Sequence, residues 1–181
     1  MSFFQGRSVV SPVLLALSLT LVGCGAGGAA SVPAVAAVEA GEMPAGQQWT
    51  GVYYHRVYGY LHIIERDGAI FARWKHSDGS KWGQLSGERK GNLFRFEWKE
   101  YTYGSVGAGA ARKGRGYFIY EMGPDGIAVL KGEYGLDSDE TGAAWVCLKQ
   151  PGRKSDPDSI KGEVGGADVP LIQDRWDQPR K

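Results

Sequence analysis

The chain has 181 residues, a formal net charge of +1 and charges of both signs scattered along it. This length fits one ordinary domain with extensions and is short for two full-sized domains. The near-neutral balance argues against nucleic acid or anionic lipid as a partner selected by bulk charge.

The amino-terminal segment has the layout of an export signal. One basic residue, Arg7, precedes an apolar run over residues 13–22 that is interrupted only by Ser18 and Thr20. A run of about ten residues suits the apolar region of a signal peptide, whereas a membrane-spanning helix needs about 20 residues. We therefore expect this segment to direct export.

The apolar run ends in Leu21-Val22-Gly23-Cys24. This sequence resembles the lipobox of bacterial lipoproteins, with a branched apolar residue, a small residue and the cysteine that is modified. The resemblance implies that residues 1–23 are a signal peptide that is removed. It also implies that acyl chains on Cys24 hold the mature protein to a membrane, because two or three chains anchor far more strongly than one.

The residues after the cysteine indicate which membrane is expected, and they also offer an alternative cleavage site. Gly25 is not the aspartate that retains lipoproteins in the inner membrane of Gram-negative bacteria, so the resemblance implies the outer membrane rather than the inner one. An ordinary secretory signal cut at the A-x-A pattern of Ala34-Val35-Ala36 is the alternative.

Two stretches that flank the middle of the chain have little core-forming material. Residues 24–48 contain no aromatic residue and are rich in Ala, Gly and Val, which predicts a flexible linker that spans roughly 25 to 30 Å. Residues 150–181 are polar with little periodicity, and we expect them to be disordered.

The middle of the chain, residues 49–149, has the pattern of one β domain. All aromatic residues except Phe3, Phe4 and Trp176 lie within it. Alternation is clearest over residues 93–101, where large aromatic and charged side chains take turns and so lie on opposite faces of a strand. Strands are predicted at 49–56, 60–66, 69–76, 81–89, 93–101, 116–121, 127–134 and 143–149.

The connections between these runs are short and carry turn residues, for example Asp67-Gly68, Gly91-Asn92 and Asp125-Gly126. Short connections require antiparallel neighbours, and eight such strands can hide their edges by closing. We predict an all-β fold, an eight-stranded antiparallel up-and-down barrel, with a two-sheet β-sandwich as the alternative. The spacing Trp49-x-Gly51-x-Tyr53 resembles that of small avidin-like and lipocalin-like barrels.

One connection, residues 104–114, is rich in Gly and Ala and is followed by Arg115. A phosphate-binding loop would need a Lys and a Ser or Thr after its last glycine, and a helix after that. The segment before residue 116 is therefore interpreted as a hairpin loop.

No motif predicts a catalytic residue, a cofactor or a metal site. Cys147 sits in a strand-like run, where it is expected to act as a small buried hydrophobe. The histidines His55, His62 and His76 fall on three successive predicted strands and are interpreted as strand residues rather than zinc ligands. The carboxylates are interpreted as members of cross-strand charge pairs, namely Glu65, Glu88, Glu97 and Glu133.

Alternation and facing glycines place a set of aromatic residues inside the barrel. These are Trp49, Tyr53, Trp74, Phe96, Trp98, Tyr134 and Trp145. An eight-stranded barrel is either filled by its own side chains or holds one small ligand, which these residues would then line.

These observations lead to a functional hypothesis and two alternatives. The chain is expected to be a membrane-anchored envelope lipoprotein whose barrel binds an envelope partner or a small apolar ligand without catalysis. The alternatives are a hydrolase or isomerase that uses an open barrel mouth, and a structural accessory of a surface assembly.

Overall fold

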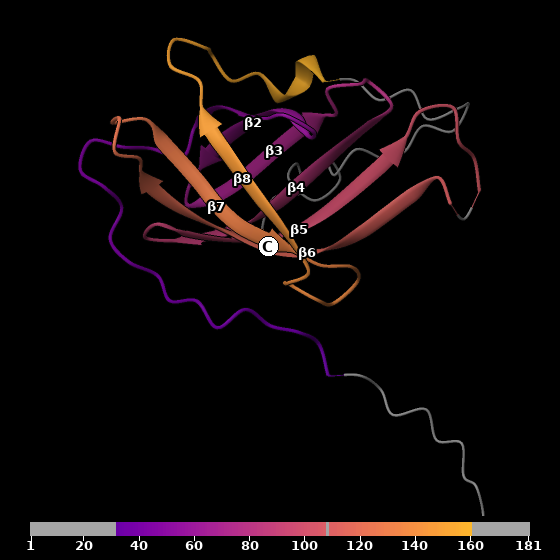
Figure 1. Cartoon of the computed structure of the whole chain (residues 1–181), viewed down its shortest axis with the longest axis horizontal. Helices are drawn as coiled ribbons and strands as arrows, with labels where there is room; N and C mark the ends of the chain where they lie inside the picture. The colour runs from indigo at the N-terminus through magenta and orange to yellow at the C-terminus, as the bar shows by residue number, and fades with distance from the viewer. Residues whose placement is uncertain (1–31, 108, 161–181) are drawn as a thin grey trace, which may run out of the picture. The chain divides into compact units, whose positions relative to one another are not determined.

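The computed structural model describes residues 32–107 and 109–160, and it shows a closed eight-stranded antiparallel barrel (Figure 1). The predicted fold class is therefore confirmed, and the sandwich alternative is wrong because the last strand pairs with the first. The strands are β1 (Gly51–His55), β2 (Gly59–Arg66), β3 (Ala69–Lys75), β4 (Lys81–Lys90), β5 (Leu93–Thr102), β6 (Ala111–Met122), β7 (Ala128–Tyr134) and β8 (Ala143–Lys149).

Each strand pairs with the next along the chain, as the short connections predict. The β2–β3 turn is typical: Asp67 and Gly68 both adopt positive φ, at 52° and 80°. Two consecutive residues of this kind match the right-handed twist of the flanking strands. Local turn chemistry thus sets the order of strands around the barrel.

β6 is longer than the sequence analysis predicts, because it starts at Ala111 instead of residue 116. The glycines in its first half are not loop residues. A Cβ on Gly114 would lie 2.9 Å from the ring of Trp98, and a Cβ on Gly116 would lie 2.7 Å from the ring of Phe96. These glycines make room for inward-facing aromatic rings. Their number in this segment suggested a loop, but the segment is a strand.

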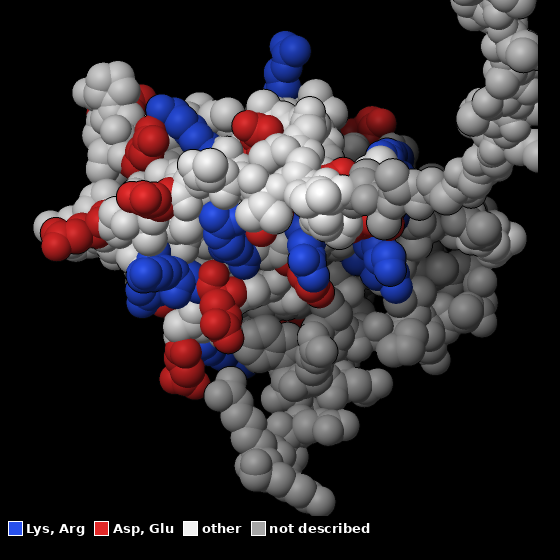
Figure 2. Space-filling view, turned by 90° about the horizontal axis from the view of Figure 1, so that it is seen from below, with Lys and Arg blue, Asp and Glu red and all other residues white. Residues whose placement is uncertain are grey.

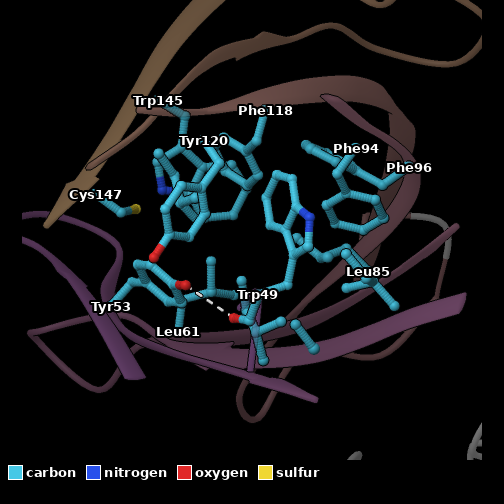
Figure 3. Close-up of a cluster of buried hydrophobic side chains, with 14 of the residues drawn as sticks. Trp49, Tyr53, Leu61, Leu85, Phe94, Phe96, Phe118, Tyr120, Trp145 and Cys147 are labelled. Carbon is cyan, nitrogen blue, oxygen red and sulfur yellow. Dashed lines mark hydrogen bonds between the residues drawn. The ribbon is translucent and has the colours of Figure 1, made fainter. Parts of the chain in front are cut away.

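The barrel interior is filled by its own side chains (Figure 3). The rings contact one another mainly edge to face, as aromatic pairs prefer. For example, the Trp145 ring lies 5.2 Å from the rings of both Trp74 and Phe118. The largest side chains that are almost fully buried include Trp49, Tyr53, Tyr120, Phe94, Phe118 and Leu85.

The segment before the barrel, residues 34–49, packs against it and is here named the N-terminal strap. Ala36 is buried in a cluster with Leu93 and Tyr117 on the outer face of the barrel. Gly41 N donates to Asn92 Oδ1 over 2.7 Å, and Asn92 N donates to Gly41 O over 3.1 Å. The expectation of a flexible linker is therefore wrong for this part, because strand residues supply the contacts that the composition lacks.

The segment after the barrel, residues 150–160, also packs against strands and ends in the short 3₁₀-helix η1 (Pro157–Ser159). Asp158 pairs with Arg73 on β3 over 3.2 Å, and Ile160 is buried against Trp82 and Tyr101. The expected disorder is wrong for these residues, since they cover apolar side chains on the outside of β4 and β5.

The predicted signal peptide, Cys24 and residues 161–181 lie outside the described residues. Within the described part, no helix has the length and apolar character required to cross a membrane.

Candidate functional site

The two ends of the barrel differ, and the first is closed by the N-terminal strap. Trp49 is 1% exposed and enters the barrel there, where its indole N–H donates to Gly91 O over 3.4 Å. The hydroxyl of Tyr53 donates to Trp49 O over 2.8 Å, as the dashed line in Figure 3 shows. The amine of Lys149 donates to Gln48 O over 2.8 Å. Burial lowers the pKa of this amine.

The opposite end, here named the mouth, carries a polar and aromatic cluster. Tyr58, in the β1–β2 turn, reaches across to Tyr134 at the end of β7, and their hydroxyl oxygens lie 2.7 Å apart. The Tyr58 ring lies 5.0 Å from the ring of Trp145 at an interplanar angle of 66°. Burial, followed by the hydrogen bond to Tyr134, raises the pKa of Tyr58, so its hydroxyl stays protonated.

A charged network lies beside these tyrosines. Glu100 is on the inward-facing side of β5, and its two carboxylate oxygens contact His76 Nε2 at 2.8 Å and Lys81 Nζ at 3.0 Å. Burial raises the pKa of Glu100, but the hydrogen bonds and charges of His76 and Lys81 outweigh this, so the net pKa lies below its usual value. Glu100 is therefore an engaged carboxylate rather than a proton acceptor.

His55 shapes the turn that carries Tyr58. Its Nδ1 accepts hydrogen bonds from the backbone N–H groups of Val57 at 3.2 Å and Tyr58 at 3.1 Å. Its ring also stacks on the Tyr58 ring with centroids 4.6 Å apart. Burial, together with the charges of Arg56 and His76, lowers the pKa of His55, which keeps the ring neutral and able to accept.

The mouth encloses a cavity of about 20 Å³, on the scale of a single water molecule. Its lining residues are Tyr58, Trp74, Trp98, Glu100, Arg112, Tyr134 and Trp145. The buried indole N–H of Trp74 has no hydrogen-bond partner within the described part of the chain. The mouth thus offers donors, one guanidinium and aromatic walls, but no volume for an organic molecule without movement.

The aromatic residues that the sequence placed inside are buried, except that Tyr134 is half-buried at the mouth. They do not form one site. Trp74, Trp98, Tyr134 and Trp145 meet at the mouth. Trp49 and Tyr53 belong to the strap end, and Phe96 packs between Phe94 and Phe118.

Sequence reasoning missed Tyr58, Glu100, His76 and Arg112 as members of the mouth. Glu100 could have been found, because period-two alternation places it on the same face as Phe96 and Trp98. No local signal could have found Tyr58, whose position depends on where a turn projects its side chain.

Two other residues considered as candidates, Cys147 and His62, lie away from the mouth and make structural contacts. Cys147 is free, buried in the interior, and burial raises the pKa of its thiol, which confirms its expected character as a small hydrophobe. His62 faces outward and accepts a hydrogen bond from Asp156 N over 3.0 Å. Within residues 32–107 and 109–160, no group of three or more His, Cys, Asp and Glu side chains could hold a metal ion.

The sequence predicts cross-strand charge pairs for the carboxylates, and Glu97 forms one with its direct neighbour on β6, Arg115, over 3.3 Å. Glu65 instead lies on the inward-facing side of β2, and its partner, Arg89, is on β4, which does not pair with β2. On the face shown in Figure 2, basic and acidic side chains are interspersed. That face therefore has no broad area of one sign.

Comparison of the chain with protein-family models, with curated proteins and with solved structures finds no match.

Proposed function

We propose that the protein is an exported lipoprotein, held to a membrane of the cell envelope by acyl chains on Cys24, whose barrel binds an envelope protein. The sequence Leu21-Val22-Gly23-Cys24 after a basic and an apolar segment supports the anchor. The outer membrane is the proposed location, because Gly25 follows the cysteine.

The filled interior is the observation that favours a protein partner over a small apolar ligand. A carrier barrel must enclose a pocket of several hundred Å³, since pockets that bury small ligands measure about 300 to 1,000 Å³. Here aromatic rings occupy the axis of the barrel, and the cavity at the mouth measures about 20 Å³. Recognition by the outer surface and the mouth is therefore the better-supported form of binding.

The alternative of an enzyme that catalyses a reaction at the mouth is less well supported. A general base needs a carboxylate or imidazole with a free lone pair near a substrate. Glu100 is engaged by His76 and Lys81, and the Nδ1 lone pair of His55 is used by two backbone N–H groups. These contacts suit a rigid binding surface.

The anchor is tested by the substitution Cys24→Ala in cells supplied with a labelled fatty acid. The natural chain should take up the label and shift in mobility after cleavage, and the variant should do neither. Cys147→Ala is the matched control, because that thiol is buried and should not be acylated. Labelling of the Cys24→Ala chain at the natural level would refute the proposed anchor.

The choice of partner class is tested with a fluorescent fatty-acid analogue. We expect no saturable binding by the natural chain, because aromatic and aliphatic side chains fill the barrel and the cavity at its mouth measures only about 20 Å³. Trp145→Ala provides the positive control, since it removes the ring at the centre of the aromatic cluster and opens a cavity. Stoichiometric binding by the natural chain would restore the carrier hypothesis.

A further inference from the structure

The seam that closes the barrel is only partly paired. β1 and β8 pair at two positions, Tyr53 with Lys149 and Tyr54 with Leu148, and Gln150 N adds a hydrogen bond to Val52 O over 2.8 Å. β7, in contrast, pairs with β8 from Leu148 back to Ala143. Within the part of the chain that the structure describes, the first half of β8 therefore has a neighbouring strand on one side only.

The register fixes which backbone groups are left over. Because Gln150 N donates to β1, the even-numbered residues of β8 direct their N–H and C=O groups away from β7. The other side of the sheet gives the same result. Gly135 N donates to Arg115 O, so odd-numbered residues of β7 bond to β6 and even-numbered ones bond to the odd-numbered residues of β8. The two N–H and two C=O groups of Ala144 and Val146 thus lie in the plane of the sheet and point away from β7, at positions beyond the end of β1.

These groups have no hydrogen-bond partner in the described part of the chain, and both residues are exposed, Val146 by 44%. The β1–β2 turn does not cover them because it is held on its other side. Ser77 N donates to Val57 O over 3.1 Å, and Ser77 Oγ donates to Arg56 O over 2.8 Å. The free edge is consequently a fixed feature of the fold beside the mouth.

We propose that this free edge, the backbone of residues 144–146, binds an extended segment of another polypeptide as an added β-strand. Alternating N–H and C=O groups at strand spacing are matched by the backbone of another strand. On the outer face, Val146 and Leu148 would meet apolar side chains of the added segment. This inference rests on the proposed function and specifies how its protein partner is recognised.

Charge and size select the kind of segment. Arg56 and Arg112, at the turn and the mouth, are exposed and form no ion pair with another described residue, so an acidic side chain on the added strand is favoured. A second copy of this chain is a poorer occupant. A dimer formed through a free edge of two residues would bury far less than the roughly 1,200 Å² of a stable interface.

The test is amide hydrogen exchange on the full chain, read residue by residue, with a short synthetic peptide of alternating valine and threonine around a central glutamate. At a peptide concentration about ten times its Kd, exchange at Ala144 and Val146 should slow about tenfold. The amides of Trp145 and Cys147 already face β7 and should not change. The same peptide N-methylated at alternate residues is the control that leaves the protein untouched, and it should give no protection.

Two variants separate backbone from side-chain recognition. Val146→Thr keeps the amide and should retain protection at Ala144, whereas Val146→Pro removes the donor and should abolish it; proline is tolerated at strand edges. Unchanged exchange at both residues with millimolar peptide, or equal protection by the N-methylated peptide, would overturn the proposal. So would protection that depends on protein concentration alone, which would identify a second copy. None of these outcomes reports on acylation of Cys24, so failure here is distinct from failure of the anchor.

Discussion

The strap end and the mouth are built from the same residue types but serve different purposes. At the strap end, Trp49 fills the barrel and neighbouring hydroxyl, amine and carbonyl groups are paired with one another. At the mouth, Tyr58 bridges to Tyr134 from a turn. Among residues 32–107 and 109–160, the indole N–H of Trp74 has no partner and part of the β8 edge is unpaired. The comparison indicates that packing is concentrated at one end while groups able to bind a partner collect at the other.

The largest expected effect tests whether the strap end carries the stability. Trp49→Ala should lower the free energy of unfolding by about 3–5 kcal/mol, because it leaves a cavity among Phe94 and Tyr120. Urea unfolding followed by circular dichroism measures the loss. Val35→Ala in the exposed part of the strap is the control and should stay within about 0.5 kcal/mol of the natural chain. Similar losses in both variants would contradict the assignment.

The next effect tests how tightly the rings near the mouth are packed. A Cβ on Gly83 would lie 2.3 Å from the Trp74 ring. Gly83→Ala should therefore cost about 1–3 kcal/mol through displacement of the indole, and it should change the tryptophan fluorescence. Gly126→Ala is not a suitable control because of its positive φ, whereas Gly109→Ala in open space should leave both signals unchanged.

A smaller effect depends on pH. The folded-state pKa of Glu100 lies below its ordinary value of 4.5, so its stabilisation is complete above pH 4.5 and disappears as the pH falls through the folded value. Glu100→Gln should cost about 1–2 kcal/mol at pH 7, since hydrogen bonds to charged groups are the stronger ones. The two unfolding curves should converge in more acidic solution. A constant difference at every pH would show that the charge of Glu100 is not involved.

The smallest effect concerns the bridge across the mouth. Tyr58→Phe removes the hydroxyl contact with Tyr134 but keeps the ring, so about 0.5–1.5 kcal/mol should be lost. Exchange of the backbone amides near residue 58 should also quicken. Tyr60→Phe, whose side chain faces outward, should match the natural chain in both measurements. Equal behaviour of the two variants would mean that the bridge does not hold the turn.

Much of the barrel could be predicted because its determinants are local. Alternation over 93–101 fixed which side chains face inward, and Asp67-Gly68 or Gly91 fixed where the chain turns, since positive φ is favourable there. The interior positions of Trp74 and Trp145 followed in the same way. The strand missed in part was β6, where Gly114 and Gly116 serve rings that arrive from β5 and not a turn.

The sequence by itself determined the number and order of strands, their antiparallel pairing and the aromatic content of the core, because period-two patterning and turn residues act over a few positions. Only the tertiary structure decided that the strap and residues 150–160 pack on the barrel, and that Glu100, His76 and Tyr58 meet at the mouth. It alone also decided that the edge of β8 extends beyond β1. These features depend on the closure of the barrel, which brings together residues that are distant in the chain and leaves no local pattern.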